Sequence, residues 1–262
     1  MRRAKKYAVI TGASSGIGVE FAKRFAAEGY SIVLVARRES RLDKVKEQLK
    51  DYMDTGTKCL VMKADLGNMD ECKALVDKLK NIPVAVFINN AGFGDCGEFV
   101  KTDLSKEMDM IDVNVKALHY LAKKMLRQFK SQGCGYLLNV ASSAGLIPAG
   151  PYMATYYATK AYVVSLTRAI ARELYEAGSN IYIGCLCPGP VDTEFNANAN
   201  VEFTMRGISA GYCANYAVDM MKKRKVVIIP TLLMKTLMIS GRFLPQKIYI
   251  ANISKRQKQK IW

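Results

Sequence analysis

Short apolar runs alternate with longer amphipathic stretches along most of the chain. The apolar runs predict strands at 7–11, 31–36, 58–63, 84–89, 135–141, 180–187 and 226–229. The stretches between them predict helices at 16–29, 40–53, 69–80, 107–131, 153–177 and 210–224. Continuously apolar strands that alternate with helices are typical of a parallel sheet covered on both faces.

This alternation predicts the fold class α/β, with a Rossmann-like, doubly wound parallel sheet in a single domain. The connections between the strands are expected to be right-handed crossovers. A chain of 262 residues is long enough for one such domain with a large core. We assign residues 1–229 to a dinucleotide-binding domain that includes the catalytic site.

The last segment, 230–262, departs from this pattern and predicts a C-terminal helical extension. Its apolar residues are crowded together at Leu232, Leu233, Met234, Leu237, Met238, Ile239, Phe243 and Leu244. Basic residues lie between them, which is also typical of a helix on a membrane surface. We expect a lid over the substrate cleft, a contact with another subunit or a membrane-surface helix, and favour packing against protein.

The net charge of +16 invites a nucleic-acid interpretation. Much of the excess lies in three basic groups, at 2–6, 222–225 and 255–260. No aromatic residues are interleaved with them to stack on bases, so we do not expect specific nucleic-acid binding. We interpret the charge as a solvated basic surface, with weak contact to an anionic membrane as a second interpretation.

Seven cysteines and a single histidine, His119, show no spacing typical of a metal site. No apolar run reaches the roughly 18 residues of a membrane span, and a strand-like run that begins at Tyr7 argues against a signal peptide. We therefore expect a reduced, cytoplasmic protein without a metal ion. A peripheral location at the inner membrane surface remains an alternative.

A glycine-rich turn follows the first predicted strand and opens the first predicted helix. Gly12, Gly16 and Gly18 lie at this junction, where a glycine motif can bind the phosphates of a dinucleotide. Glycine permits the tight turn and lets a pyrophosphate approach the backbone closely. The spacing Gly-x-x-x-Gly-x-Gly differs from the commoner fingerprint, so a plain strand-to-helix turn remains an alternative.

The end of the second predicted strand bears on the type of cofactor. A site for NAD usually places an acid there to hold the ribose 2′-hydroxyl, whereas this strand is followed by Arg37 and Arg38. A guanidinium is a planar, permanently charged group that matches a 2′-phosphate. We therefore expect NADP(H) rather than NAD(H).

Tyr156 and Lys160 carry the clearest sign of chemistry. They are four residues apart, so the phenol and the ammonium lie on one face of a predicted helix. A neighbouring cation favours the phenolate, whose ordinary pKa is about 10, and so makes tyrosine a usable acid or base near neutral pH. Tyr157 has no lysine one turn later, and we interpret it as a packing residue.

Together these features resemble the short-chain dehydrogenase/reductase family. The matching motifs run in the family's order over 7–195: Thr11-Gly12-Ala13-Ser14-Ser15-Gly16-Ile17-Gly18, Ala64-Asp65-Leu66, Asn89-Asn90-Ala91-Gly92, Asp112-Val113-Asn114-Val115, Asn139-Val140-Ala141-Ser142-Ser143, Tyr156-x-x-x-Lys160 and Pro188-Gly189-Pro190-Val191-x-Thr193. Any one of them is weak by itself, and the ordered set is specific.

The resemblance implies four catalytic residues: Asn114, Ser142, Tyr156 and Lys160. Tyr156 would exchange a proton with the substrate, and Lys160 would lower the pKa of that phenol and hold the nicotinamide ribose. Ser142 would hydrogen-bond the substrate oxygen, and Asn114 would position a water. Counting back from Tyr156 selects Ser143 instead of Ser142, but insertions fall in loops more easily than in strands, which favours Ser142.

The resemblance also implies a cofactor site that runs from the glycine turn to the loop after the strand predicted at 180–187. Asp65 would contact the adenine, and the loop 188–193 would follow the nicotinamide. The expected cofactor-binding residues are Gly12, Ser14, Ser15, Gly16, Ile17, Gly18, Arg37, Arg38, Asp65, Leu66, Asn89, Ala91, Gly92, Tyr156, Lys160, Pro188, Gly189, Val191 and Thr193.

We therefore expect an NADP(H)-dependent oxidoreductase that interconverts a carbonyl and a secondary alcohol on an apolar small molecule, such as a steroid-like or acyl-derived ketone. The apolar extension, with Phe93, Met153, Phe195 and Phe203, would line its cleft. A non-catalytic NADP(H)-responsive regulator on the same fold is the alternative. The resemblance further implies a homodimer or homotetramer.

Overall fold

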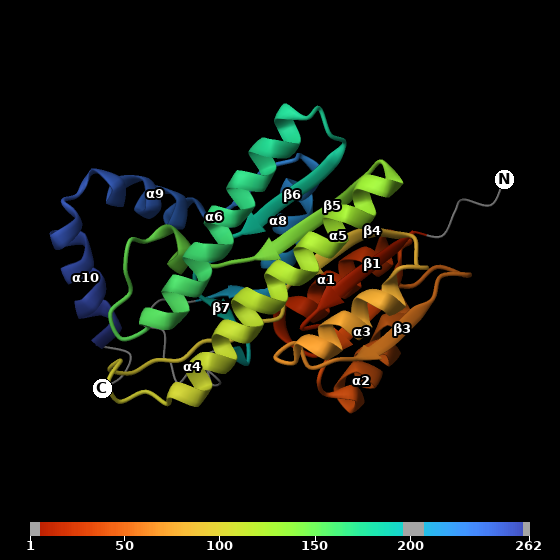
Figure 1. The fold of residues 1–262 in the computed structure, drawn as a ribbon, viewed down its shortest axis with the longest axis horizontal. Coiled ribbons are helices and arrows are strands. Elements are labelled where there is room, and N and C mark those ends of the chain that lie inside the picture. The colour runs from red at the N-terminus through yellow and green to blue at the C-terminus, as the bar shows by residue number, and fades with distance from the viewer. Residues whose placement is uncertain (1–5, 196–206, 259–262) are drawn as a thin grey trace.

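The structure is a computed structural model that describes residues 6–195 and 207–258. Its centre is a seven-stranded parallel sheet in the order β3-β2-β1-β4-β5-β6-β9 (Figure 1). The strands are β1 (Tyr7–Thr11), β2 (Ser31–Ala36), β3 (Cys59–Lys63), β4 (Val84–Asn89), β5 (Gly135–Val140), β6 (Ile181–Leu186) and β9 (Val227–Ile228).

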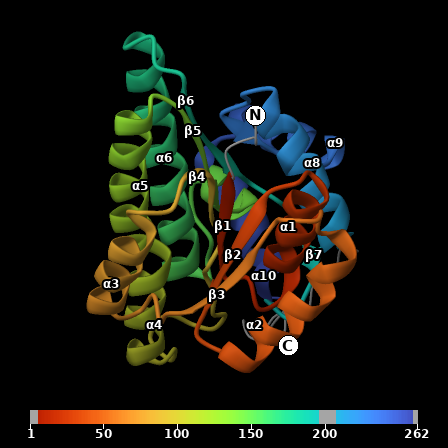
Figure 2. The ribbon, with the colours of Figure 1, turned by 90° about the vertical axis from the view of Figure 1, so that its right-hand side faces the viewer.

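Helices cover both faces of the sheet, as Figure 2 shows. One face carries α1 (Gly16–Ala27), α2 (Glu39–Leu49) and α8 (Ala210–Lys222). The other carries α3 (Met69–Leu79), α4 (Leu104–Ile111), α5 (Leu118–Gln132) and α6 (Ala154–Glu176). The predicted doubly wound α/β fold is therefore confirmed.

Each face of the sheet has its own apolar core because neighbouring residues of a strand point to opposite sides. In β4, Val86 and Ile88 belong to the core beneath α1, whereas Phe87 belongs to the core beneath α5. Phe21 and Phe129 are fully buried on the two sides. Burying one such side chain stabilises the fold by about 1.5–3 kcal/mol.

The helix predicted at 107–131 differs most from the structure. It begins earlier, at Leu104, because Asp103 caps its amino end by accepting a hydrogen bond from the Ser105 backbone N–H. A π-helical segment, η2 (Asp112–Ala117), then separates α4 from α5. Such segments are rare and are frequent at functional sites.

The remaining predicted boundaries differ by smaller amounts. The helix predicted at 40–53 ends at Leu49 and continues as the 3₁₀ turn η1 (Lys50–Tyr52), while the bounds of the other predicted helices and strands differ by at most two residues. The sequence did not predict the short parallel pair β7 (Val191–Asp192) and β8 (Ile208–Ser209). Two-residue strands are too short to produce a period.

The C-terminal extension is helical, as predicted. It consists of α9 (Leu232–Ser240), the 3₁₀ turn η4 (Gly241–Phe243) and α10 (Gln246–Lys258), at the side of the sheet toward which the strand arrows point (Figure 1). Among the helices that the structure describes, none is both long and apolar enough to cross a bilayer.

The order of the strands places a ligand-binding crevice between β1 and β4. The chain runs from β1 outward to β3 on one side, and from β4 outward to β9 on the other. In open α/β sheets, ligands bind at the carboxyl ends of the strands where this direction reverses.

We predict that the junction of β1 and α1 tolerates no added methyl group at Gly18. A Cβ atom there would lie closer than 3.0 Å to the Gly12 carbonyl oxygen, a backbone atom that cannot rotate away. Gly18→Ala should lower the free energy of unfolding by about 1–3 kcal/mol in urea denaturation.

Gly211→Ala is the matched control in the first turn of α8. Its added Cβ would meet only the flexible carboxylate of Glu20, at 3.3 Å. This variant should be unchanged or up to about 1 kcal/mol more stable. Equal stability of the two variants would contradict the packing described here.

Candidate active site

A cavity of about 980 Å³ opens at the carboxyl ends of the strands and contains most of the predicted site. All predicted cofactor and catalytic residues line it except Gly18, Asn89 and Asn114. Phe93, Met153 and Phe195 line it as well, and Phe203 lies outside the described residues. The structure therefore brings the glycine turn and the Tyr156–Lys160 pair to one cavity.

The glycine turn adopts the backbone conformation that its sequence suggests. Gly12 and Gly16 have φ angles of +64° and +57°, in the left-handed region that favours glycine. Ser15 is the amino-terminal cap of α1, but its side chain makes no capping hydrogen bond, and the first turn contains no acid. Ser15, Gly16 and Ile17 at this helix end line the cavity, and a helix amino end without a side-chain cap fits a phosphate.

Asn90, which is not among the predicted site residues, holds this turn in place. Its Nδ2 donates to the carbonyl oxygens of Thr11 and Gly12, at 2.9 and 3.2 Å. The backbone N–H groups of Asn90 and Ala91 donate to the Thr11 hydroxyl, at 2.9 and 3.1 Å. These bonds tie the end of β1 to the end of β4.

Asn89, which is among the expected cofactor-binding residues, lies away from the cavity. Its Nδ2 donates to the Leu118 carbonyl oxygen at 3.0 Å and to Asn139 Oδ1 at 3.3 Å, and its side chain is buried. Adjacent residues at a strand end point to opposite sides. The alternation along β4 was therefore a signal that could have found Asn90.

The end of β2 presents a basic surface to the cavity. Arg37 and Arg38 both line it. Arg38 Nη2 lies 3.4 Å from Ser14 Oγ in the glycine turn and 3.8 Å from Glu194 Oε2. Arg41 pairs with the same carboxylate at 2.6 Å. The residue after β2 is Arg37 and not the acid that is usual in NAD sites.

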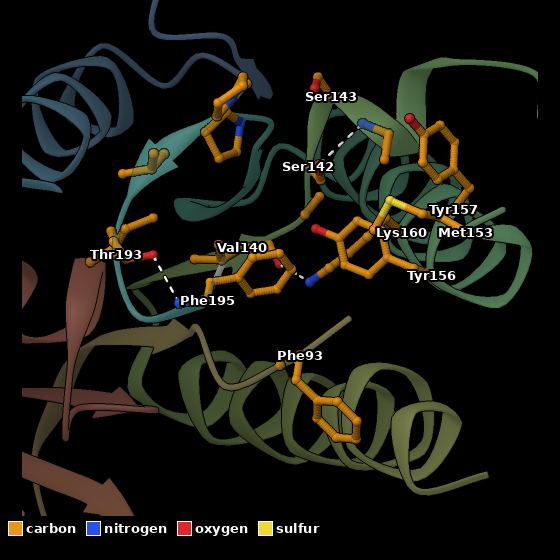
Figure 3. Close-up of a pocket in the computed structure, with 18 of the residues that line it drawn as sticks. Phe93, Val140, Ser142, Ser143, Met153, Tyr156, Tyr157, Lys160, Thr193 and Phe195 are labelled. Atoms are coloured by element: carbon orange, nitrogen blue, oxygen red, sulfur yellow. Dashed lines mark hydrogen bonds between the residues drawn. The ribbon is translucent and has the colours of Figure 1, made fainter. Parts of the chain in front are cut away.

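Tyr156 and Lys160 lie one turn apart on α6, and both are buried. Lys160 Nζ lies 5.8 Å from the centre of the Tyr156 ring and donates to the Val140 carbonyl oxygen at 3.0 Å (Figure 3). The Ser142 hydroxyl lies close enough to the Tyr156 phenol to act on its pKa, which it lowers. Figure 3 shows Ser143 pointing away from this group, so the structure places Ser142 beside Tyr156.

Asn114 lies behind these residues, in the π-helical segment. Its Nδ2 donates to the Phe93 carbonyl oxygen at 2.9 Å and to Thr159 Oγ1 at 3.2 Å, while its Oδ1 accepts from the Phe93 N–H at 3.1 Å. Thr159 Oγ1 in turn donates to the Tyr156 carbonyl oxygen at 2.7 Å. Asn114 thus joins the loop after β4 to helix α6.

The loop after β6 closes the cavity over the glycine turn. The Phe195 N–H donates to Thr193 Oγ1 at 3.3 Å, and the Phe195 ring lies 5.6 Å from the ring of Tyr156 (Figure 3). A Cβ atom on Gly16 would lie 3.2 Å from the Thr193 side chain. The small residue is therefore needed where this loop crosses the start of α1.

The extension forms one wall of the cavity, which agrees with the first of its three expected roles, a lid over the cleft. Its apolar residues Leu233, Met234, Leu237, Met238 and Leu244 line the cavity. Gln257 of α10 is buried and donates a hydrogen bond to the Tyr157 hydroxyl. Tyr157 therefore does more than pack, because it anchors the last described helix to α6. A lone polar residue in a basic segment gave no signal for this contact.

Comparison with known proteins identifies the family to which this fold belongs. The model for short chain dehydrogenases matches residues 6–202. The chain belongs to the short-chain dehydrogenase family.

This short-chain dehydrogenase is 34% identical over 189 residues to an uncharacterized oxidoreductase of Staphylococcus epidermidis, a match that covers 72% of this chain and 79% of that protein. It is 32% identical over 185 residues to a very-long-chain 3-oxoacyl-CoA reductase of Scheffersomyces stipitis, which covers 67% of this chain and 53% of that protein.

Among solved structures, it is similar to a short-chain dehydrogenase from Sphingobium yanoikuyae in complex with NADPH. The TM-score is 0.81 at 32% identity, and the match covers 90% of this chain and 93% of that chain. The protein is therefore an oxidoreductase of a family that binds nicotinamide cofactors, and the uncapped helix end and glycine turn described above fit such a group.

The pKa of Tyr156 differs from the expectation. In this short-chain dehydrogenase, burial raises the pKa of Tyr156 to about 12, and the nearby Ser142 hydroxyl only partly opposes this rise. Burial also lowers the pKa of Lys160 to about 8. The prediction that Lys160 brings the phenol below its ordinary pKa is therefore wrong for the protein's own residues, because desolvation by burial is the largest influence on the pKa of each group.

We predict a pH-dependent stability that comes from Lys160. Its pKa in the folded state, about 8, lies below its ordinary value of 10.5. Between these values the unfolded chain binds the additional proton, so the free energy of unfolding rises with pH. Relative to Lys160→Met, the wild-type protein should gain about 2 kcal/mol between about pH 8 and pH 10.

Urea denaturation at several pH values measures this difference. Lys78→Met, at an exposed position of α3, is the control and should keep the wild-type slope. Parallel pH profiles for the wild-type protein and Lys160→Met would show that the buried ammonium is not perturbed.

Proposed function

We propose that this protein is an NADP(H)-dependent oxidoreductase that interconverts a carbonyl and a secondary alcohol on an apolar small molecule. The observation that carries the proposal is the convergence of Tyr156, Ser142 and Lys160 on the cavity that also receives the glycine turn. A non-catalytic NADP(H)-responsive regulator would have no need of this acid/base group.

The choice of NADP(H) rests on the basic end of β2. Arg37 and Arg38 line the cavity next to the glycine turn, where a 2′-phosphate on the adenosine ribose would meet them. A charge-assisted hydrogen bond to phosphate is stronger than one between neutral groups. The similar structure from Sphingobium yanoikuyae is a complex with NADPH, which supports this choice.

Each polar residue at the reacting end has a proposed part. When bound in this cavity, a nicotinamide cofactor would provide the hydride chemistry. Tyr156 donates a proton to the carbonyl oxygen of the substrate, and Ser142 donates a hydrogen bond to that oxygen. Lys160 supplies positive charge beside the phenol and contacts the ribose. A Tyr156 pKa of about 12 keeps the phenol protonated at neutral pH, which suits carbonyl reduction.

The lining of the cavity supports an apolar substrate. Phe93, Met153 and Phe195 surround the reacting end, and the apolar residues of α9 form the opposite wall. Apolar pockets with a few convergent polar groups are typical of small-molecule sites. One relative is a very-long-chain 3-oxoacyl-CoA reductase, which favours an acyl-derived ketone, and a rigid steroid-like ketone is the second substrate class.

The two parts of the chain have different proposed roles. Residues 1–229 would bind the cofactor and carry the acid/base group, and residues 230–262 would act as a lid. The hydrogen bond between Gln257 and Tyr157, together with the apolar lining from α9, supports the lid. A cytoplasmic location remains a prediction from the cysteines and the start of the chain, and assembly as a homodimer or homotetramer remains a prediction of the resemblance.

We predict that Tyr156→Phe lowers kcat for NADPH-dependent ketone reduction by about 10²–10⁴-fold, because the phenol is the proposed proton donor. The affinity for NADPH, measured by fluorescence titration, should change little. Tyr162→Phe is the control, since Tyr162 lies on the same helix but is partly exposed and bonded to His119. Full activity of Tyr156→Phe would remove Tyr156 from the mechanism, and NADPH binding without turnover of any ketone by the wild-type protein would favour the regulator.

We predict that the double variant Arg37→Gln/Arg38→Gln binds NADPH about 10²–10⁴-fold more weakly, because charge-assisted hydrogen bonds contribute about 1.5–3 kcal/mol each and two are lost. NADH serves as the internal control, since it has no 2′-phosphate, and its affinity should stay within about twofold. Equal losses for both cofactors would contradict the assignment of these arginines to the phosphate.

A further inference from the structure

The extension exposes more large apolar side chains than any comparable stretch of the described residues. Phe243 is 85% exposed and Leu232 is 75% exposed. The full set is Leu232, Leu233, Ile239, Phe243, Leu244 and Ile248, which we call the outer apolar face. An exposed apolar cluster of this kind usually marks a site of interaction with a protein or a membrane.

The charge of the same segment is entirely positive. Residues 230–258 contain six basic residues, Lys235, Arg242, Lys247, Lys255, Arg256 and Lys258, and no aspartate or glutamate. Lys247, Lys255, Arg256 and Lys258 are exposed, and of these Lys247 and Lys258 do not line the cavity. A basic residue near an anionic lipid surface contributes about 1 kcal/mol of attraction. Apolar and positively charged groups therefore occupy one segment together.

Another exposed apolar group shows why this combination matters. Phe99, Val100 and Leu104 are exposed in the segment before and at the start of α4. Glu98 and Asp103 lie beside them in the sequence, and Lys101 pairs with Glu98 at 2.8 Å. The positive charge there is compensated, so that group has no electrostatic preference for an anionic surface.

A second copy of the chain fits the outer apolar face poorly. In a symmetric dimer through this face, the two segments would bring their basic residues together without any acid from either segment. Like charges that face each other at an interface cost free energy. An anionic lipid surface complements both the apolar and the charged groups.

We propose that the outer apolar face and the basic residues around it dock this protein on membranes that contain anionic lipids. Large apolar residues beside basic ones are the composition with which amphipathic helices bind at the lipid–water interface. The docking does not depend on the proposed reaction.

The position of the face has a consequence that does rest on the proposed function. Leu233 and Leu244 are 56% and 45% exposed on the outer apolar face and also line the cavity. The surface that would meet the lipid is therefore continuous with the wall of the site. An apolar ketone dissolved in the bilayer would reach the cavity without crossing water.

Co-sedimentation of the full chain with lipid vesicles tests the docking. Vesicles of phosphatidylcholine that contain about one third phosphatidylglycerol should bind the wild-type protein at least about tenfold better than vesicles of phosphatidylcholine alone. Ile239→Ser/Phe243→Ser should lower the binding to anionic vesicles by about tenfold or more, because each apolar side chain inserted contributes at least about 1 kcal/mol. Neither residue lines the cavity.

Two further variants separate charge from apolar contact. Lys247→Gln/Lys258→Gln should weaken binding to the anionic vesicles by about tenfold and leave the weak binding to neutral vesicles unchanged. Tyr175→Ser is the control, since Tyr175 is a 76% exposed aromatic residue in the last turn of α6, away from the extension. It should bind like the wild-type protein.

Several outcomes would overturn the proposal. Equal vesicle binding by the wild-type protein and by the double variant Ile239→Ser/Phe243→Ser would exclude the outer apolar face as the contact. Circular dichroism would first have to show that the double variant is folded. A fall in oligomer size for that variant in analytical ultracentrifugation, without a change in vesicle binding, would assign the face to a second copy. Tyr156→Phe should still bind vesicles, so a failure of the proposed reaction leaves this test intact.

Discussion

The joint between β1 and β4 is the constraint on which the site depends. The Asn90 amide and the Thr11 hydroxyl connect the two strand ends. They lie at the point where the order in which the chain adds strands to the sheet reverses. The glycine turn is attached to one side of this joint, and the loop that leads to Gly92 and Phe93 is attached to the other. Any shift between the two strands would therefore move the phosphate end and the reacting end of the cavity apart.

From that joint, a chain of hydrogen bonds continues to the proposed acid. The Phe93 backbone exchanges hydrogen bonds with the Asn114 side chain, and the Asn114 amide donates to the Thr159 hydroxyl. The Thr159 hydroxyl in turn donates to the Tyr156 carbonyl oxygen. Gly92 has no side chain because a Cβ atom would lie 2.7 Å from Asn114 Oδ1 and 3.3 Å from Lys160 Nζ. The π-helical segment brings Asn114 into this chain, which explains why an irregular turn is kept inside an otherwise regular helix pair.

The sequence predicted the sheet, its helices and most of the site because local patterns carried that information. Apolar strands and a glycine turn are local features, and Tyr156 with Lys160 is a four-residue pattern. The choice between Ser142 and Ser143 needed the direction of each side chain, which the loop before Tyr156 obscures. Asn90 was missed because two adjacent asparagines look alike until the strand alternation is applied to them.

The other misses depend on contacts between distant parts of the chain. The pKa of Tyr156 was wrong in direction because burial is a property of the packed cavity, to which the loop after β6 and the extension contribute. Gln257 meets Tyr157 across 100 positions of the sequence, and no periodicity marks such a pair. Distant packing, rather than local propensity, decides these features.

That last contact links the extension to the proposed acid through one side chain. Gln257 hydrogen-bonds the residue next to Tyr156, whereas Tyr7 starts β1 at the amino ends of the strands, away from the cavity. A change that displaces α10 would therefore be felt at the neighbour of the proposed acid through a single hydrogen bond. A change at the start of β1 would have to pass along the whole strand to reach the same group.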